Sequence, residues 1–327
     1  MTELRPTRAQ TLAAAEVIGK HLKPALLREE PAFAELSGTR VLVKYEFLNP
    51  LRSFKVRGAL NLAHALSQRD DISRALTAST GNHGAAMAFA CREYGIPLTV
   101  GVPVNCDRSK VDLLRRFEPE LEFVGRDIDE AKELLLRRGL PSDTLFVEDG
   151  SCPEIYAGTS TISWEIFQQL PEVDAVIVPV GNGALIGGIG SLLKDCDASI
   201  QVIGVQSDQA PCMTQSFELG RPVNSENCDT FASGMAVRVS IPEAVELMLE
   251  VVDQMVLVGD DELKKAMGLY LQHTGFLPEG AGAGALAAAL KLGPDLRGKT
   301  VCLIASGANV DPELKREIEV NFKPGAF

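Results

Sequence analysis

The sequence predicts an α/β protein with two lobes, each containing a mainly parallel, twisted sheet flanked by helices. Short apolar and β-branched runs alternate with helical patterns along most of the chain, which is typical of parallel strands joined by crossover helices. The chain has 327 residues, 46% of them hydrophobic and 23% charged. It is therefore long enough and apolar enough to bury two substantial cores.

Nine stretches have the length and composition of strands, and helical patterns lie between them. The predicted strands are residues 41–47, 75–79, 98–102, 121–125, 144–148, 174–180, 201–206, 254–259 and 299–306. Gly95 is placed to end the helix after the second strand, because glycine readily adopts the left-handed conformation found beyond helix C-termini.

Evenly spaced strand and helix units between residues 74 and 150 predict one compact, smaller lobe. Residues 1–73 and 151–327 flank it and predict a larger, discontinuous lobe. If the flanking segments share a sheet, the smaller lobe is an insertion, and the cleft between the lobes is the natural place for a binding site.

Charge and cysteine content disfavour several classes of partner. The formal net charge is −12 and the pI is about 4.9, which disfavours nucleic acids and anionic membranes and favours a small-molecule substrate. No apolar run is long enough to span a membrane. Scattered cysteines without a C-x-x-C pair indicate reduced thiols, and the N-terminus lacks a signal-peptide pattern, so we expect a cytoplasmic protein. Histidines and cysteines show no zinc-binding spacing, so we expect no metal.

Lys55 lies where an extended segment turns into a helix, in the stretch SFKVRGALNLAHAL. Ser53 is a suitable N-cap residue, which places Lys55 in the first helical turn. The predicted helix has one apolar face, formed by Val56, Leu60, Ala63 and Leu66. A cation at this end faces the positive end of the helix dipole, at a cost of about 0.3–1 kcal/mol, which favours a neutral, nucleophilic amine. The alternative is an ordinary exposed lysine.

Three other predicted strands end in small polar or glycine-rich turns. The first such turn, residues 79–83, offers unpaired N–H groups and short side chains to a carboxylate or phosphate, although plain capping by Ser79 or Thr80 is the alternative. In the turn at residues 179–188, glycines let the backbone approach a phosphate; the spacing is not that of a dinucleotide fingerprint, and a tight turn is the alternative. Ser306 ends the last strand, either as a turn former or as a hydroxyl offered to a ligand.

Together, in this order, these stretches resemble the fold-type II pyridoxal-phosphate enzymes, specifically the serine/threonine dehydratase and serine racemase group. The resemblance covers nearly the whole chain. The residues that carry it are SFKVRGA (53–59), STGNHG (79–84), PVGNGALIGG (179–188) and SGAN (306–309).

The resemblance implies a role for each matching residue. Lys55 would form the covalent bond to pyridoxal 5′-phosphate with Phe54 beside it, Asn82 would bind the phenolic oxygen, and Ser306 would bind the pyridine nitrogen. The phosphate would be held by Gly181, Asn182, Gly183, Ala184 and Leu185. The substrate carboxylate would be held by Ser79, Thr80, Gly81, Asn82 and His83. The larger lobe would then bind the cofactor and the smaller lobe would grip the substrate.

The activity implied is α,β-elimination from a β-hydroxy or β-substituted amino acid, similar to serine or threonine, which yields a keto acid and ammonia. Lys55 would remove the Cα proton, and Thr80 is the second candidate catalytic residue. A neutral hydroxyl at Ser306 favours elimination over transamination. Thr80 stands where serine racemases carry the serine that reprotonates the opposite face, which argues against racemisation. A homodimer is a further expectation from the family.

Several positions depart from the family pattern. Asn182 and Ala184 replace glycines of the phosphate loop, and Ser233 replaces a common aspartate. Gln206 and Cys212 stand where cation-binding members carry acids, which argues against a divalent metal beside the cofactor. Side chains that could reach the substrate are Arg52, Met235 and Arg238.

Other functions remain open from the sequence. A β-replacement synthase resembling cysteine synthase is the nearest alternative, but histidine rather than threonine after Asn82 favours the dehydratases. An amino-acid racemase is another alternative. A non-catalytic nucleotide-binding or metabolite-binding protein could use the same glycine turn, but it would not explain Lys55.

Overall fold

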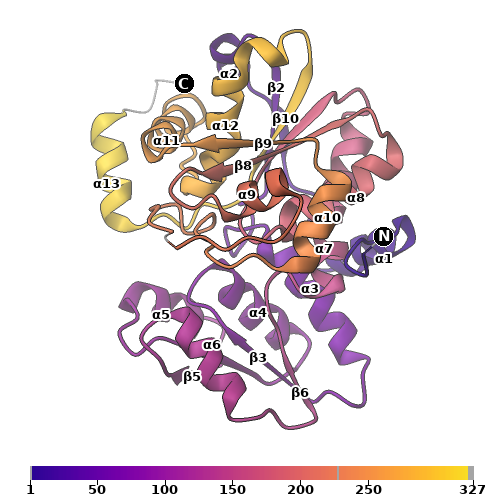
Figure 1. The fold of residues 1–327 in the computed structure, drawn as a ribbon, viewed down its shortest axis with the longest axis vertical. Coiled ribbons are helices and arrows are strands. Elements are labelled where there is room, and N and C mark those ends of the chain that lie inside the picture. Colours follow the sequence, from indigo (N-terminus) through magenta and orange to yellow (C-terminus); the bar gives the residue numbers. More distant parts are fainter. Residues whose placement is uncertain (1, 227, 323–327) are drawn as a thin grey trace.

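A computed structural model describes residues 2–226 and 228–322 and confirms two α/β lobes (Figure 1). The larger lobe is built on a six-stranded sheet whose order is β1 (Leu27–Glu29), β2 (Arg40–Tyr45), β10 (Thr300–Ala305), β7 (Ala175–Pro179), β8 (Gln201–Ser207) and β9 (Gln254–Val258). All neighbouring strands pair in parallel except β1, which is antiparallel to β2. The sequence analysis missed β1, because three residues are too few to show a strand period.

The smaller lobe contains a four-stranded parallel sheet. Its order is β5 (Glu120–Phe123), β4 (Leu98–Val102), β3 (Arg74–Ala78) and β6 (Thr144–Phe146). The nine predicted strands correspond to β2 to β10, with ends displaced by no more than two residues. β2 lies in one sheet with β7 to β10, although β3 to β6 come between them in the sequence. The division at residues 74 and 150 stays a prediction.

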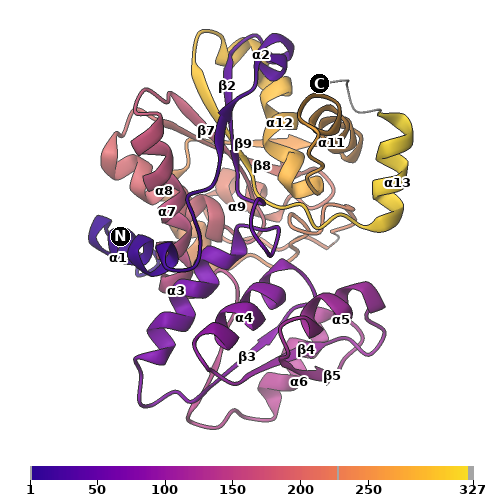
Figure 2. The same ribbon diagram turned by 180° about the vertical axis from the view of Figure 1, so that it is seen from behind.

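Helices cover both faces of the larger sheet (Figure 2). One face packs against a group that contains α2 (Pro31–Ser37), α11 (Asp260–Thr274), α12 (Gly280–Leu292) and α13 (Pro312–Asn321). The other face packs against a group that contains α1 (Arg8–Gly19), α3 (Lys55–Ser67), α7 (Pro153–Gln169), α8 (Ala184–Cys196) and α10 (Pro242–Val251). The short helix α9 (Cys212–Leu219) follows β8, and a 3-10 helix (Gly293–Leu296) follows α12.

Helix α3 belongs to the core of both lobes. Its predicted apolar face is buried, and it packs against α7 of the larger lobe and α4 (Asn82–Glu93) of the smaller lobe. Both views place it at the junction of the two lobes (Figures 1 and 2). One continuous apolar cluster therefore runs from the larger sheet through α3 into the smaller lobe. On the far side of the smaller sheet, a separate small cluster packs under α6 (Ile128–Arg137); α5 (Arg108–Arg115) packs against α4.

The motif segments follow the carboxyl ends of strands that are neighbours in space. Lys55 follows β2, Ser306 follows β10 and the glycine turn follows β7, and these three strands are adjacent in the larger sheet. Residues 79–83 follow β3 of the smaller sheet. Ligands of open α/β sheets bind at this edge, outside the carboxyl ends of the strands. Gly95 follows α4 with a φ of 68°, as predicted.

Within the described residues, no helix is both long enough and apolar enough to cross a membrane.

Candidate active site

Lys55 is the first residue of α3, and its amine lies between a carboxyl group and an aromatic ring. Its Nζ donates a hydrogen bond to Asp149 Oδ2 and lies 4.8 Å from the centre of the Phe54 ring. Only 16% of the Lys55 side chain is exposed. The ordinary exposed lysine that the sequence left open is therefore wrong.

The expected N-cap at Ser53 is displaced by one residue. Phe54 already has helical backbone angles and occupies the N-cap position. Ser53 Oγ instead accepts a hydrogen bond from the N–H of Lys55 at 3.3 Å, so it still satisfies one free donor of the helix end.

The loop after β10 is held against the segment that leads into α3. Phe54 N–H donates to the backbone oxygen of Ser306 at 2.9 Å, and Ala308 N–H donates to the backbone oxygen of Arg52 at 2.9 Å. Ser306 is only 3% exposed, and its hydroxyl makes no hydrogen bond within the described part of the chain. These contacts fix Ser306 beside the Lys55 segment with its side chain available to a ligand.

Asp149 is a site residue that the sequence analysis missed. It lies in the loop after β6, the strand adjacent to β3. Burial opposes ionisation of its carboxyl, but the positive charge of Lys55 and the hydrogen bonds from Lys55 and Asn182 leave the Asp149 pKa below its ordinary value. The signal that could have found it is its position at the carboxyl end of a parallel strand, as for residues 79–83.

His83 lies on the other side of Asp149. Its Nδ1 is 3.6 Å from Asp149 Oδ1, which is too long for a hydrogen bond. Burial lowers the His83 pKa, despite the nearby charge of Asp149, so the imidazole is neutral at neutral pH. Both His83 Nε2 and Asp149 Oδ1 are buried without a hydrogen-bond partner in the described residues. Such orphaned atoms indicate that a ligand completes the site.

Asn82 is held by two residues of the larger lobe. Its Nδ2 donates to Glu279 Oε1 at 2.9 Å, and its Oδ1 accepts from Asn309 Nδ2 at 2.7 Å. Glu279 also accepts the Asn309 backbone N–H at 3.0 Å, and burial raises the pKa of Glu279 to about 7. The Asn82 amide is therefore fixed in orientation, with one N–H left for a ligand. Nothing in the sequence pattern marks Glu279 or Asn309 as a partner of Asn82, which is 197 residues from Glu279 along the chain.

The glycine turn before α8 forms a cradle at the helix N-terminus. Gly183 has a φ of 98°, and a Cβ added to Gly181 would lie 2.5 Å from the backbone oxygen of Gly234. No side chain caps α8 in the usual way, and Asn182 Oδ1 reaches the N–H of Ala184 at 3.3 Å. Asn182 Nδ2 donates to the backbone oxygen of Asp149, which joins the cradle to the Lys55 site. Leu185 is buried in the first turn.

Some backbone N–H groups of the turn at residues 79–83 already have a hydrogen-bond partner within the turn itself. Ser79 Oγ accepts the N–H groups of Gly81 at 3.3 Å and Gly84 at 3.2 Å. Gly81 is the N-cap of α4 without a side-chain cap, and the Thr80 hydroxyl makes no hydrogen bond in the described structure. The Thr80 hydroxyl and the other N–H groups at the start of α4 are therefore left for an anionic ligand.

The other positions noted in the sequence have different surroundings. Gln206 Oε1 accepts hydrogen bonds from Thr214, and the Cys212 thiol donates to the backbone oxygen of Val237. Across residues 2–226 and 228–322, no group of three His, Cys, Asp or Glu residues is arranged to hold a metal ion. Met235 is fully buried, and Arg238 pairs with Asp129 of α6 across the two lobes.

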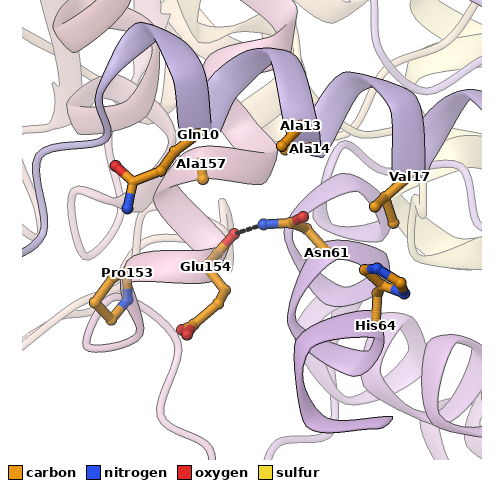
Figure 3. A pocket seen from close by; sticks show the side chains of 9 residues that line it. All are labelled: Gln10, Ala13, Ala14, Val17, Asn61, His64, Pro153, Glu154 and Ala157. Carbon is orange, nitrogen blue, oxygen red and sulfur yellow. Dashed lines mark hydrogen bonds between the residues drawn. The ribbon is translucent and has the colours of Figure 1, made fainter. Parts of the chain in front are cut away.

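A hollow of about 250 Å³ between α1, α3 and α7 lies away from these residues (Figure 3). It is lined by Gln10, Ala13, Ala14, Val17, Asn61, His64, Pro153, Glu154 and Ala157. None of the predicted site residues lines it, so it is not part of the candidate active site.

Comparison with known proteins assigns the chain to a family. Residues 18–307 match the family described as pyridoxal-phosphate dependent enzyme. The chain belongs to this family. An L-threonine ammonia-lyase from Thermotoga maritima is 37% identical over 279 residues, which cover 85% of this chain and 69% of that relative. The prediction of a pyridoxal-phosphate dependent lyase related to the serine/threonine dehydratases is confirmed.

Solved structures of pyridoxal-phosphate dependent enzymes share the fold over nearly the whole chain. Threonine deaminase isoform 2 from Solanum lycopersicum has a TM-score of 0.85 at 28% identity, covering 96% of this chain and 93% of that chain. Maize serine racemase has a TM-score of 0.90 at 24% identity, covering 97% and 98%. The likeness to the racemase shows the fold alone.

The residues of the site fit this family's cofactor. The glycine cradle at the α8 N-terminus suits a phosphate, because backbone N–H groups and the helix dipole favour an anion there. The Lys55 amine and the Ser306 hydroxyl follow adjacent strands of the larger sheet, and Asn82 of the smaller lobe is joined to Asn309, three residues after Ser306.

Proposed function

We propose that this enzyme eliminates water from a β-hydroxy amino acid of the serine or threonine kind and releases a keto acid and ammonia. The observation that carries the proposal is that Asp149 joins the three parts of the site. It accepts hydrogen bonds from the Lys55 amine and from Asn182 of the glycine cradle, and its Oδ1 lies 3.6 Å from Nδ1 of His83 in the turn at residues 79–83. The names of its threonine-acting relatives support the choice of substrate.

Pyridoxal phosphate, when bound, supplies an electron sink for the electron pair left on Cα. Gly181, Asn182, Gly183, Ala184 and Leu185 would hold its phosphate. Asn82 would donate its remaining N–H to the phenolic oxygen, and Ser306 would offer its hydroxyl to the ring nitrogen. Phe54, directly before Lys55, would line the same space.

The substrate would be held from the smaller lobe. The N–H groups and hydroxyls of Ser79, Thr80, Gly81, Asn82 and His83 would bind the α-carboxylate, because the uncapped end of α4 favours an anion. That contact would present Cα to Lys55, which takes the proton. Thr80 offers a hydroxyl on the carboxylate side, as a positioning group.

Three further features belong to the proposal. The enzyme would be cytoplasmic and would form a homodimer. Residues 1–73 with 151–327 would make the cofactor-binding domain, and residues 74–150 the substrate-gripping domain. Catalysis would need no divalent metal, since Gln206 and Cys212 already bond to the protein itself.

The test is a keto-acid assay with the purified protein and pyridoxal phosphate, using L-serine and L-threonine. We expect a yellow protein whose colour is lost on borohydride reduction, which should leave the cofactor covalently attached to Lys55. It should release keto acid and ammonia without any added nucleophile. A protein that never binds the cofactor would contradict the proposal. Product formed only with an added thiol would indicate a β-replacement synthase, and accumulation of the D-amino acid would indicate a racemase.

A further inference from the structure

Lys55 and Asp149 form a pair of titratable groups that can exchange a proton, which a lysine acting alone cannot do. Lys55 Nζ donates directly to Asp149 Oδ2, so a proton can pass between the two groups without an intervening residue. The side chains are 16% and 19% exposed, and Asp149 Oδ1 is buried without a hydrogen-bond partner. One oxygen of the carboxyl thus faces the catalytic amine while the other has no partner.

The charge of Lys55 controls whether Asp149 carries a proton. Burial is the largest influence on the Asp149 pKa and raises it, and the positive charge of Lys55 is the largest influence that lowers it. When Lys55 becomes neutral, this compensation is lost and the buried carboxyl gains affinity for a proton. The neutral His83 imidazole, 3.6 Å away, does not replace the missing charge. A proton that leaves the Lys55 amine therefore has Asp149 as a directly bonded acceptor.

We propose that Asp149 is a second catalytic residue, the acid that protonates the departing β-hydroxyl group. This inference rests on the proposed function. A hydroxide ion is a poor leaving group, so breaking the Cβ–O bond requires a proton on the oxygen, and general acids accelerate such steps by about 10²–10⁴-fold.

The proton balance closes over one turnover. Lys55 starts as a neutral amine and Asp149 as a carboxylic acid. Lys55 takes the Cα proton and becomes an ammonium; the Cβ–O bond then breaks, the oxygen keeps the electron pair and takes the Asp149 proton, and water leaves. The ammonium and carboxylate that remain are the ion pair seen in the structure. Transfer of a proton from Lys55 to Asp149 restores the starting state, with no net change in either residue.

The experiment compares two substrates on the holoenzyme of Asp149→Asn. With L-threonine or L-serine we expect kcat/KM to fall by about 100-fold or more, because asparagine has no acidic proton to give. With β-chloro-L-alanine, whose chloride leaves without a proton, we expect kcat/KM within about threefold of the unmodified enzyme. Cofactor absorbance, recorded for each variant, checks that the site is loaded.

Glu148→Gln is the matched control. Glu148 is the neighbouring carboxylate, is 37% exposed and pairs with Lys132 on α6. We expect Glu148→Gln to leave both substrates unaffected. If Asp149→Asn does not fold, Asp149→Ser is used with the same expected pattern.

Two results would overturn the inference. One is full activity of Asp149→Asn with L-threonine. The other is an equal loss of activity with both substrates, which would mean that Asp149 only positions Lys55 or stabilises the fold. Failure of the proposed function looks different, because the unmodified enzyme would then release no keto acid from L-threonine or L-serine.

Discussion

Lys55 and Arg57 are two residues apart at the start of α3, yet their charged groups lie in opposite kinds of environment. Arg57 donates five hydrogen bonds: two to Glu46, two to Glu165 and one to Thr161, at 2.7–3.1 Å. Buried Lys44 also pairs with Glu165. Lys55, in contrast, meets a carboxyl with one orphaned oxygen and a histidine with an orphaned nitrogen.

The difference in hydrogen-bond satisfaction separates a network that stabilises the fold from a group of residues that can bind a ligand. Around Arg57, two cations face two carboxylates and every guanidinium N–H has a partner, so the network is complete without a ligand. Around Lys55, buried polar atoms remain unsatisfied, at a free-energy cost that a bound cofactor and substrate can remove. The network around Arg57 holds the start of α3 in place, and the residues around Lys55 are those that we propose perform the chemistry.

The largest expected effect is on activity and comes from Lys55→Ala. We expect turnover to fall by about 10⁴-fold or more, because the base at Cα is lost. The variant should still fold, since the Arg57 network is untouched. Keto-acid release and circular dichroism measure the two effects. Retained turnover would show that another residue removes the proton.

The opposite pattern is expected for Arg57→Met, which breaks the structural network. We expect the free energy of unfolding to fall by about 3–5 kcal/mol, because buried Glu46 loses its ion-pair partner and Glu165 keeps only Lys44. Chemical denaturation measures the loss. Arg69→Met is the matched control: Arg69 pairs with Asp71 at the surface, so stability should not change measurably. Equal effects in both variants would contradict the comparison.

A smaller effect, on how stability varies with pH, is expected from Glu279→Gln, which changes the partner of Asn82. Burial raises the pKa of Glu279 to about 7 in the folded state, above its ordinary value of 4.5. Between these pH values the folded protein binds the extra proton, so the contribution of this group to stability is full below pH 4.5 and is lost as pH rises toward 7. The free energy of unfolding, measured at a series of pH values across this range, should fall as pH rises. The fall should be shallower in Glu279→Gln, by up to about 1.4 kcal/mol per pH unit. Parallel curves for the two proteins would contradict the assignment.

The smallest effect, a gain in stability, is expected from Arg52→Gly, three residues before the start of α3. Arg52 has a φ of 54°, which is strained for a residue with a Cβ, and its side chain is exposed. Relief of this strain outweighs the added backbone entropy of glycine, so we expect a gain of about 0.5–1 kcal/mol. The thermal midpoint should rise, whereas Arg52→Ala should leave it nearly unchanged. A lower midpoint in Arg52→Gly would show that the Arg52 side chain stabilises the fold.

The sequence predicted the parts of this molecule that are set by local pattern. The strand positions, the apolar face of α3 and the turn at Gly95 follow from periodicity and from the conformational freedom of glycine. β1 was missed because its three residues carry no pattern of their own and pair only through β2. The cap at Phe54 instead of Ser53 depends on the contact between Phe54 and the Ser306 loop, which is 252 positions away in the chain.

The site was predictable only where a motif marks it. Lys55, residues 79–83, the glycine turn and Ser306 were found because they resemble a known pattern, and their detailed roles stay predictions. Asp149 lies at the carboxyl end of a parallel strand, but no local signal shows that it contacts Lys55, 94 residues away, or that Glu279 contacts Asn82, 197 residues away. Partnerships of this kind are decided by which strands become neighbours in the sheets, which no single segment encodes.

The shared position of α3 has a practical consequence for dissecting the enzyme. A fragment of residues 74–150 would retain α4 but lose the apolar surface of α3 against which α4 packs. Its own sheet would be complete, yet the side of α4 that packs against α3 would be exposed to water. Expressed alone, such a fragment would aggregate, whereas one that starts before residue 55 would carry its missing partner with it.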